Sequence, residues 1–171
     1  MTQPTSPIEL TGAVARLGAV AALPPGFGER IGAICASTTD VAATAEASRD
    51  WWPLAMHWSL AGQVLQRAAL VARPTDTAQV AAVVAMCNDA GVPITAAGGR
   101  SGVLGASIPL FGGVLLDLTA MQGIVAVDTT SGVVEVLPGT FGPELETELR
   151  AGHGLTIGHF PQSFDIATVG G

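Results

Sequence analysis

The chain has 171 residues, of which 49% are hydrophobic and 12% charged, and its net charge is −7. This hydrophobic fraction excludes a disordered chain, and the length is enough for one core of ordinary size. The acidic balance, without any basic stripe, argues against a nucleic-acid-binding surface.

The N-terminal residues predict a first helix that ends near residue 23. Residues 6–9 read Ser-Pro-Ile-Glu, a capping box with proline at the first helical position. No basic stretch precedes the apolar run, so we do not expect a secretory signal. Arg16 interrupts that run, which is the longest in the chain, so we expect no transmembrane segment.

Two more helices are expected before residue 50. One covers residues 28–36, and the other, capped by Asp40, extends to about residue 48. Residues 1–50 are therefore predicted to form a helical N-terminal preface. Residues 51–171 are predicted to form the main domain.

Three tryptophans, Trp51, Trp52 and Trp58, begin this domain in a chain that has no tyrosine. Two interpretations stay open. The indoles either clamp the preface to the main domain or line a route for a ligand or lipid. His57 has no acid or cysteine nearby in the sequence, so we expect it to be structural.

A strand, a helix and a second strand are predicted over residues 69–72, 76–90 and 92–95, with Thr75 as the helix cap. Their short connections indicate a right-handed βαβ unit with parallel strands. Gly91 supplies the left-handed helix stop. Apolar residues at helical spacing predict the face that packs on the sheet: Val80, Val83, Val84 and Cys87.

The two cysteines, Cys35 and Cys87, lie far apart and belong to no Cys-x-x-Cys motif. Cys87 falls within the apolar helix face, so we expect core packing and not catalysis. A reduced, buried pair fits a cytosolic compartment.

A glycine-rich loop follows the second strand, with glycines at 98, 99, 102 and 105. Glycine adopts positive φ without a Cβ penalty, so successive amides can converge into an anion-binding nest. Arg100 adds a cation and Ser101 a hydroxyl donor, which suits a pyrophosphate. The spacing matches neither common nucleotide-binding loop, and a flexible surface loop is the alternative. Ligands of parallel sheets bind at this end of the strands.

The next strand is predicted over residues 113–118 and a hairpin over 124–127 and 133–137, with Gly132 in the turn. Within the hairpin, Glu135 is expected to face water, and its neighbours Val134 and Val136 the core.

A helix should begin at Gly142 and stop at Gly152, followed by a last short strand over residues 155–158. His153 lies at the helix end, where a cation is mildly favoured. The helix carries three acids that are expected to form a solvated face: Glu144, Glu146 and Glu148. The chain stops in a loop-like segment, so we expect it to be the N-terminal part of a longer protein.

The order of these motifs resembles the FAD-binding domain of the vanillyl-alcohol-oxidase/PCMH flavoprotein superfamily over roughly residues 50–171. Within that superfamily, Asp50–Leu54 and the C-terminal motifs are most similar to alkyldihydroxyacetonephosphate synthases and their bacterial FAD-linked oxidase relatives. The motifs are Arg73-Pro74, Val92-Pro93-Ile94, Gly98-Gly99-Arg100-Ser101-Gly102, Leu116-Asp117-Leu118, Pro138-Gly139-Thr140, Gly158-His159-Phe160-Pro161-Gln162-Ser163 and Thr168-Val169-Gly170-Gly171.

The resemblance implies an α+β fold. Two α/β subdomains hold FAD between them in a PCMH-type domain that is incomplete at its C-terminal end. It also implies that the first loop wraps the pyrophosphate and that a second motif, residues 162–168, reaches the ribityl chain and flavin ring. Arg100 stands where some relatives attach FAD covalently through histidine, so non-covalent FAD is expected. The implied cofactor-binding residues are Ala96, Ala97, Gly98, Gly99, Arg100, Ser101, Gly102, Gln162, Ser163, Phe164, Asp165, Ile166, Ala167, Thr168, Gly170 and Gly171.

The resemblance implies the activity of alkyldihydroxyacetonephosphate synthases, in which the flavin exchanges an acyl for an alkyl group on a lipid precursor without net redox. Related 2-hydroxy-acid oxidases and dehydrogenases, of glycolate or D-lactate type, oxidise their substrates on the same fold. Motif likeness favours the first activity. The catalytic residues lie largely in later parts of the family's domain, so none is named, and no metal ligands are expected. The full-length protein is a possible homodimer.

A truncated remnant without catalysis is the remaining alternative. An open reading frame that continues beyond codon 171 would support the enzyme, and an in-frame stop the remnant. The 171-residue chain by itself is expected to bind FAD weakly or not at all.

Overall fold

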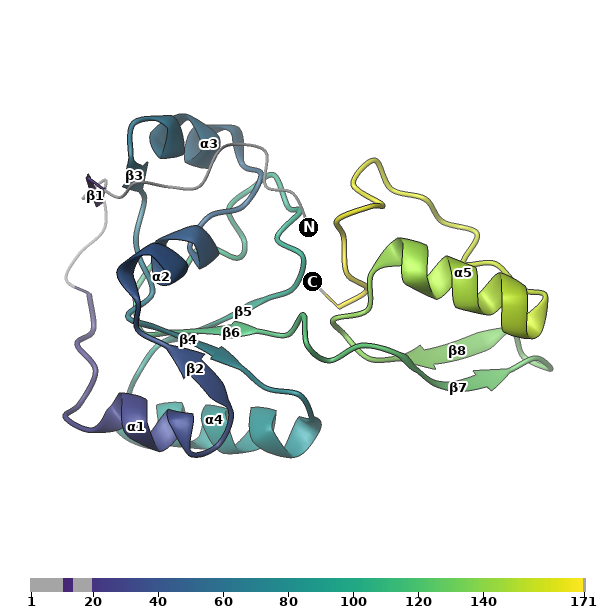
Figure 1. The fold of residues 1–171 in the computed structure, drawn as a ribbon, viewed down its shortest axis with the longest axis horizontal. Coiled ribbons are helices and arrows are strands. Elements are labelled where there is room, and N and C mark those ends of the chain that lie inside the picture. The colour runs from purple at the N-terminus through teal and green to yellow at the C-terminus, as the bar shows by residue number, and fades with distance from the viewer. Residues whose placement is uncertain (1–10, 14–19, 171) are drawn as a thin grey trace.

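The structure is a computed structural model that describes residues 11–13 and 20–170. Its fold has two lobes (Figure 1). A four-stranded sheet with its helices forms one lobe, and a two-stranded hairpin with one helix forms the other. None of the helices in the described ranges is long and apolar enough to cross a membrane.

The sheet of the first lobe has the strand order β2-β4-β6-β5. Strands β4 (Leu70–Arg73), β6 (Val114–Asp117) and β5 (Ile94–Ala97) are parallel, and β2 (Ala36–Thr38) runs antiparallel to β4. Helix α4 (Thr77–Ala90) connects β4 to β5. The predicted parallel βαβ unit is confirmed, with β6 inserted between its two strands.

The core lies on both faces of this sheet. Helices α1 (Phe27–Gly32) and α4 cover one face, and α2 (Val41–Ala47) covers the other (Figure 1). Strand residues alternate between the faces, because successive side chains of a strand point in opposite directions. Leu70 packs with Phe27 and Val83 on the first face, while Val71 packs with Ala47 on the second. Double coverage is the reason that β4 and β6 read as continuous apolar runs.

Helix α4 differs from its prediction in two details. Asp76, and not Thr75, is the N-cap, since its carboxylate accepts a hydrogen bond from the Gln79 amide at 2.8 Å. The helix ends at Gly91 with φ 63°, as expected. Val84 is 43% exposed, so the buried face is narrower than predicted and centres on Val83 and Cys87.

The residues before position 50 are less helical than predicted. Asp40 caps α2 as expected, by accepting from the Ala43 amide at 2.8 Å. The helix expected over residues 28–36 is wrong at its end, because α1 stops at Gly32 and Ala36 begins a strand paired with β4. Gly12–Ala13 form β1, beside β3 (Gln63–Val64), and most of the first predicted helix lies outside the described residues. The domain boundary at residue 50 stays a prediction.

The second lobe is the predicted hairpin with a helix on one face (Figure 1). Strands β7 (Ile124–Asp128) and β8 (Val133–Val136) pair antiparallel around Gly132, whose φ is 69°. Helix α5 (Gly142–His153) ends at Gly154, and not at Gly152 as predicted. The strand expected over residues 155–158 is wrong, since these described residues have no ladder partner.

The C-terminal segment returns to the junction of the lobes. Thr168 forms an antiparallel bridge with Phe141. The Val169 amide donates to the Thr140 carbonyl at 3.0 Å, and the Gly170 amide to the Pro138 carbonyl at 2.9 Å. These bonds hold residues 162–170 beside the start of α5 and close to the first lobe.

Candidate functional site

The two loops predicted to bind a cofactor touch each other. The glycine loop leaves β5 at the carboxyl edge of the sheet, and its Gly99 amide donates to the Thr168 hydroxyl at 3.1 Å. A Cβ at Gly99 would lie 2.0 Å from the Ile166 carbonyl oxygen. Glycine is therefore required at position 99 by the contact between the loops.

A cavity of about 620 Å³ opens between these loops. This volume falls within the range of about 300–1,000 Å³ usual for ligand sites. Both predicted motifs contribute to its wall, which consists of Trp51, Ser101, Gly102, Val103, Gln162, Ser163, Asp165 and Ile166.

The remaining predicted residues lie around this wall. Ala97 is buried in the core under α2, and Phe164 packs edge-on against Phe160 at 5.1 Å. A Cβ on Gly170 would lie 2.5 Å from the Pro138 side chain, so glycine at this position allows the close packing at the junction of the lobes. Gly171 lies outside the described residues. Ala96 belongs to strand β5, paired with Leu116. The other predicted residues belong to the two loops without lining the cavity: Gly98, Gly99, Arg100, Ala167 and Thr168.

Trp51 and Val103 also line the cavity, although the resemblance did not imply them as cofactor-binding residues. For Trp51, a place beside a ligand was one of the two interpretations left open by the sequence. The Trp51 amide donates to the Gly102 carbonyl at 3.0 Å, which ties this segment to the glycine loop. The cluster of tryptophans indicated a contact of this segment, but the sequence did not show that the glycine loop is its partner.

Arg100 has an unusual backbone and an unsatisfied side chain. Its φ is 53°, the left-handed region that non-glycine residues rarely adopt. Its buried Nε has no hydrogen-bond partner among the described residues. Burial lowers the pKa of the guanidinium, while the charges of Asp117 and Glu46 oppose that shift.

Charged groups gather behind the glycine loop. Arg73 Nε lies 3.2 Å from Asp117 Oδ2, and Arg49 lies 2.8 Å from Glu46. With Arg100 and the buried Asp50, which lies against the loop at Gly102, these groups place three cations beside three anions.

The positive φ expected of several loop glycines is found at Gly105, and at Arg100 in place of Gly98, Gly99 and Gly102. The unpaired Arg100 Nε and the cavity between the two loops fit an anionic dinucleotide.

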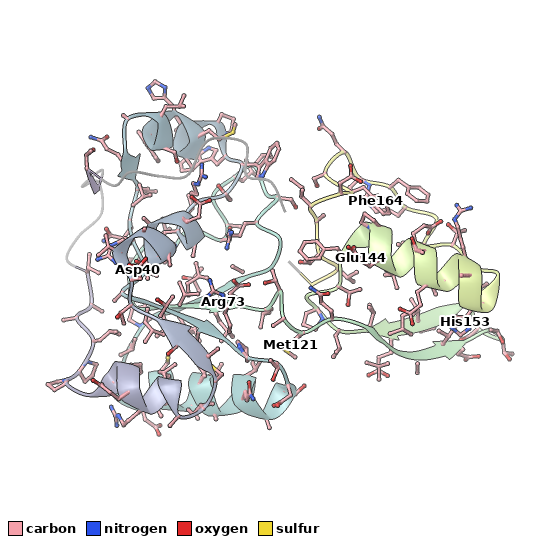
Figure 2. All side chains as sticks on the ribbon, viewed as in Figure 1. Asp40, Arg73, Met121, Glu144, His153 and Phe164 are labelled. Atoms are coloured by element: carbon pink, nitrogen blue, oxygen red, sulfur yellow. The ribbon has the colours of Figure 1, made fainter. Side chains whose placement is uncertain are left out.

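Figure 2 shows that Arg73 lies on the sheet lobe, whereas Phe164 and Glu144 lie on the hairpin lobe. Met121, in the connection between β6 and β7, lies at the junction and is 4% exposed. The Gly139 amide donates to the Met121 carbonyl at 2.8 Å. The connection between the lobes is thus itself packed and hydrogen-bonded.

Glu146 corrects the prediction of a fully solvated acidic face on α5. Glu144 and Glu148 are exposed, but Glu146 is only 8% exposed. Its carboxylate accepts from the Ile157 amide at 2.9 Å and from the Thr156 hydroxyl at 2.8 Å, and it also pairs with Arg150. The Ile157 amide is the main reason that the pKa of Glu146 is lowered. Helical spacing carries no sign of this role, because the partners lie in a later loop.

Comparison with known proteins identifies the domain. The family of the FAD binding domain matches residues 68–171. The chain is 34% identical over 105 residues to the D-lactate dehydrogenase of Anaerostipes hadrus, covering 61% of this chain and 22% of that protein. It is 32% identical over 113 residues to the alkyldihydroxyacetonephosphate synthase of Dictyostelium discoideum, covering 64% of this chain and 18% of that protein.

Solved structures agree with this assignment. An alkyldihydroxyacetonephosphate synthase superposes with a TM-score of 0.80 at 25% identity, over 91% of this chain and 30% of that chain. A p-cresol methylhydroxylase superposes with a TM-score of 0.59 over 72% of this chain and 24% of that chain, and at 19% identity this likeness concerns the fold alone. The α+β fold predicted from the motifs is the fold of these flavoenzymes.

Proposed function

The chain belongs to the FAD binding domain family, with FAD as its cofactor, and from this premise we propose that it holds FAD for an enzyme resembling alkyldihydroxyacetonephosphate synthase. The substrate class would be a lipid precursor, on which an acyl group is exchanged for an alkyl group. In the full-length protein, FAD would lie between the two lobes, bound without a covalent link.

One observation supports this activity most. The superposition with alkyldihydroxyacetonephosphate synthase extends over 91% of the chain with a TM-score of 0.80, against 83% and 0.64 for a 4-ethylphenol oxidase at the same identity of 25%. The FAD binding domain match starts at residue 68, so coverage of 91% requires residues that precede it. The likeness to the synthase is therefore wider than the shared cofactor domain.

The chain's own residues would divide the work of holding FAD. Backbone amides of the glycine loop, other than the Gly99 amide that bonds Thr168, and the Ser101 hydroxyl would bind the diphosphate, and the cations behind the loop would offset its charge. Residues 162–166 form the wall on the opposite side of the cavity. When bound, FAD supplies the ring system on which the acyl-to-alkyl exchange proceeds without net redox.

A 2-hydroxy-acid dehydrogenase is the second candidate, favoured by the 34% identity to a D-lactate dehydrogenase. The two activities differ in redox chemistry. We expect the FAD-loaded full-length protein to incorporate labelled fatty alcohol into an ether product from acyl-dihydroxyacetone phosphate. We also expect its flavin absorbance to stay unchanged when D-lactate is added without oxygen. Bleaching by D-lactate together with absence of ether product would establish the dehydrogenase instead.

The compartment and assembly are further proposals. Cys35 and Cys87 are both free and buried, which is compatible with the reducing cytosol. We propose a cytosolic protein whose full-length form is a homodimer.

The proposed non-covalent link to FAD has a direct test. Acid precipitation of the FAD-loaded full-length protein should leave all flavin in the supernatant.

A further inference from the structure

The segment Asp50-Trp51-Trp52 lies before residue 68, where the match to the FAD binding domain begins, and yet it reaches the cavity. We propose that Trp51 is a cofactor-binding residue that forms the wall of the cavity on the flavin half of FAD. This inference rests on the proposed function, since it concerns the same FAD site.

The position of Trp51 is fixed by its backbone. Its amide donates to the Gly102 carbonyl at 3.0 Å, so the segment runs along the glycine loop. Its half-buried side chain lines the cavity together with Gly102 from that loop and Ile166 from the second loop. Trp51 thus shares one cavity with the motif assigned by resemblance to the ribityl chain and flavin ring.

The neighbouring residues are occupied elsewhere and hold Trp51 in place. The Trp52 ring packs edge-on against Trp58 at 5.5 Å, and a Cβ on Gly105 would lie 3.0 Å from it. Asp50 is 1% exposed, and its Oδ1 accepts from the Trp52 amide at 3.0 Å. Trp52 therefore clamps the segment to the loop, which leaves the Trp51 indole for the cavity.

The chemistry of the lining points to a planar ligand group. Among the described residues that line the cavity, Trp51 is the one aromatic side chain. An indole covers a large flat area with little loss of conformational entropy and packs well on another ring system. The other wall residues are small, polar or aliphatic, so Trp51 would supply most of the flat contact.

The test compares three ligands that share phosphate but differ in their ring systems. FAD and riboflavin 5′-phosphate carry the flavin, whereas ADP carries only the adenine half. Dissociation constants would be measured for the full-length protein after removal of its flavin, by flavin fluorescence anisotropy and by calorimetry, at ligand concentrations into the millimolar range. Far-UV circular dichroism would verify that each variant is folded.

We expect Trp51→Ala to raise the dissociation constants of FAD and riboflavin 5′-phosphate by about tenfold, the order of one lost ring contact. ADP binding should change by less than about twofold, because ADP lacks the flavin. Trp51→Phe should restore most of the loss. The matched control is Leu54→Ala, on α3 (Pro53–Leu60), since Leu54 is 46% exposed and does not line the cavity.

Three results would overturn the inference. Unchanged flavin affinity in Trp51→Ala would remove Trp51 from the site. An equal loss for all three ligands would mean that Trp51 acts through the shape of the glycine loop. A loss confined to ADP and FAD would assign it to the adenine half. Failure of the full-length wild-type protein to bind any of the three ligands would overturn the proposed function itself, and this inference with it.

Discussion

Gly99 is the residue at which the two loops of the site come closest. Its missing side chain leaves room for the Ile166 carbonyl, which a Cβ would approach to 2.0 Å. We expect Gly99→Val to abolish FAD retention in the full-length protein, because the second loop must move away from the first. Flavin absorbance after gel filtration measures this. Gly152→Ala is the matched control, since no atom lies within 4 Å of a Cβ at that helical position.

Arg100→Ala should do less damage than Gly99→Val. Removing one charge-assisted hydrogen bond costs at most about a hundredfold in affinity, because the loop amides remain. Arg100→Gly separates the backbone from the side chain, since glycine accepts the φ of 53° without strain. Normal flavin retention by Gly99→Val would contradict the assignment of the glycine loop as the diphosphate site.

Asp50 is a buried carboxylate whose Oδ2 has no hydrogen-bond partner in the part of the chain that the structure describes. Burial raises its pKa above the ordinary value of 3.8, while the backbone amides of Trp52 and Gly105 oppose this shift. A raised folded-state pKa means that the ionised group destabilises the fold at neutral pH. That penalty disappears as the pH falls through the folded-state value.

Asp50→Asn is therefore expected to raise the free energy of unfolding near neutral pH, with a gain that shrinks under acid conditions. The asparagine keeps the acceptor for the Trp52 amide and removes the buried charge. Urea denaturation at about pH 7 and about pH 4.5 measures the difference. Asp89→Asn, on the exposed end of α4, is the control for general charge effects. A gain that grows toward low pH would refute the argument.

At the scale of elements, α5 holds the segment behind it through one side chain. Glu146 binds the Thr156 hydroxyl and the Ile157 amide, and these residues lead into the second cavity loop. A carboxylate thus replaces the strand partner that residues 155–158 do not have. The pKa of Glu146 is lowered, so this anchor contributes stability above its ordinary pKa, and the contribution is lost as the pH falls through the lowered value.

We expect Glu146→Gln to speed hydrogen exchange at the Ile157 amide, because a neutral amide is a weaker acceptor than a carboxylate. Exchange in β4 and β6 should stay unchanged, since those strands belong to the other lobe. Glu144→Gln serves as the control, because Glu144 is exposed on the same helix. Equal exchange at Ile157 in both variants would show that the anchor contributes nothing.

At the scale of the whole molecule, the chain spans less than a third of the length of its relatives: 22% and 18% of two related sequences and 30% of one related structure. We expect the 171-residue chain, expressed by itself, to bind FAD weakly and to lose it during purification. A wall that covers only part of a ligand gives up contact area and preorganisation. Absorbance in the flavin band relative to protein measures occupancy. A stoichiometric yellow chain would contradict this prediction.

Much of the fold follows from local patterns. The cap at Asp40, the stop at Gly91 and the turn at Gly132 depend on a few neighbouring residues, and the structure has all three. The glycine loop could be located in the same way, because its glycines are adjacent in the chain. The predictions that depend on distant partners fared worse: the strand over residues 155–158 is absent, and Glu146 is buried.

The sequence by itself determined the βαβ unit, the hairpin and, through the motif order, the FAD-binding family. The tertiary structure alone decided that β6 lies between β4 and β5, and that Trp51 lines the cavity while Trp52 packs against Gly105. It also decided that Gly99 leaves room for the Ile166 carbonyl. The physical reason is range. Caps, turns and periodicity arise from atoms a few residues apart, whereas strand neighbours, burial and cavity walls arise from segments that meet only when the chain has folded.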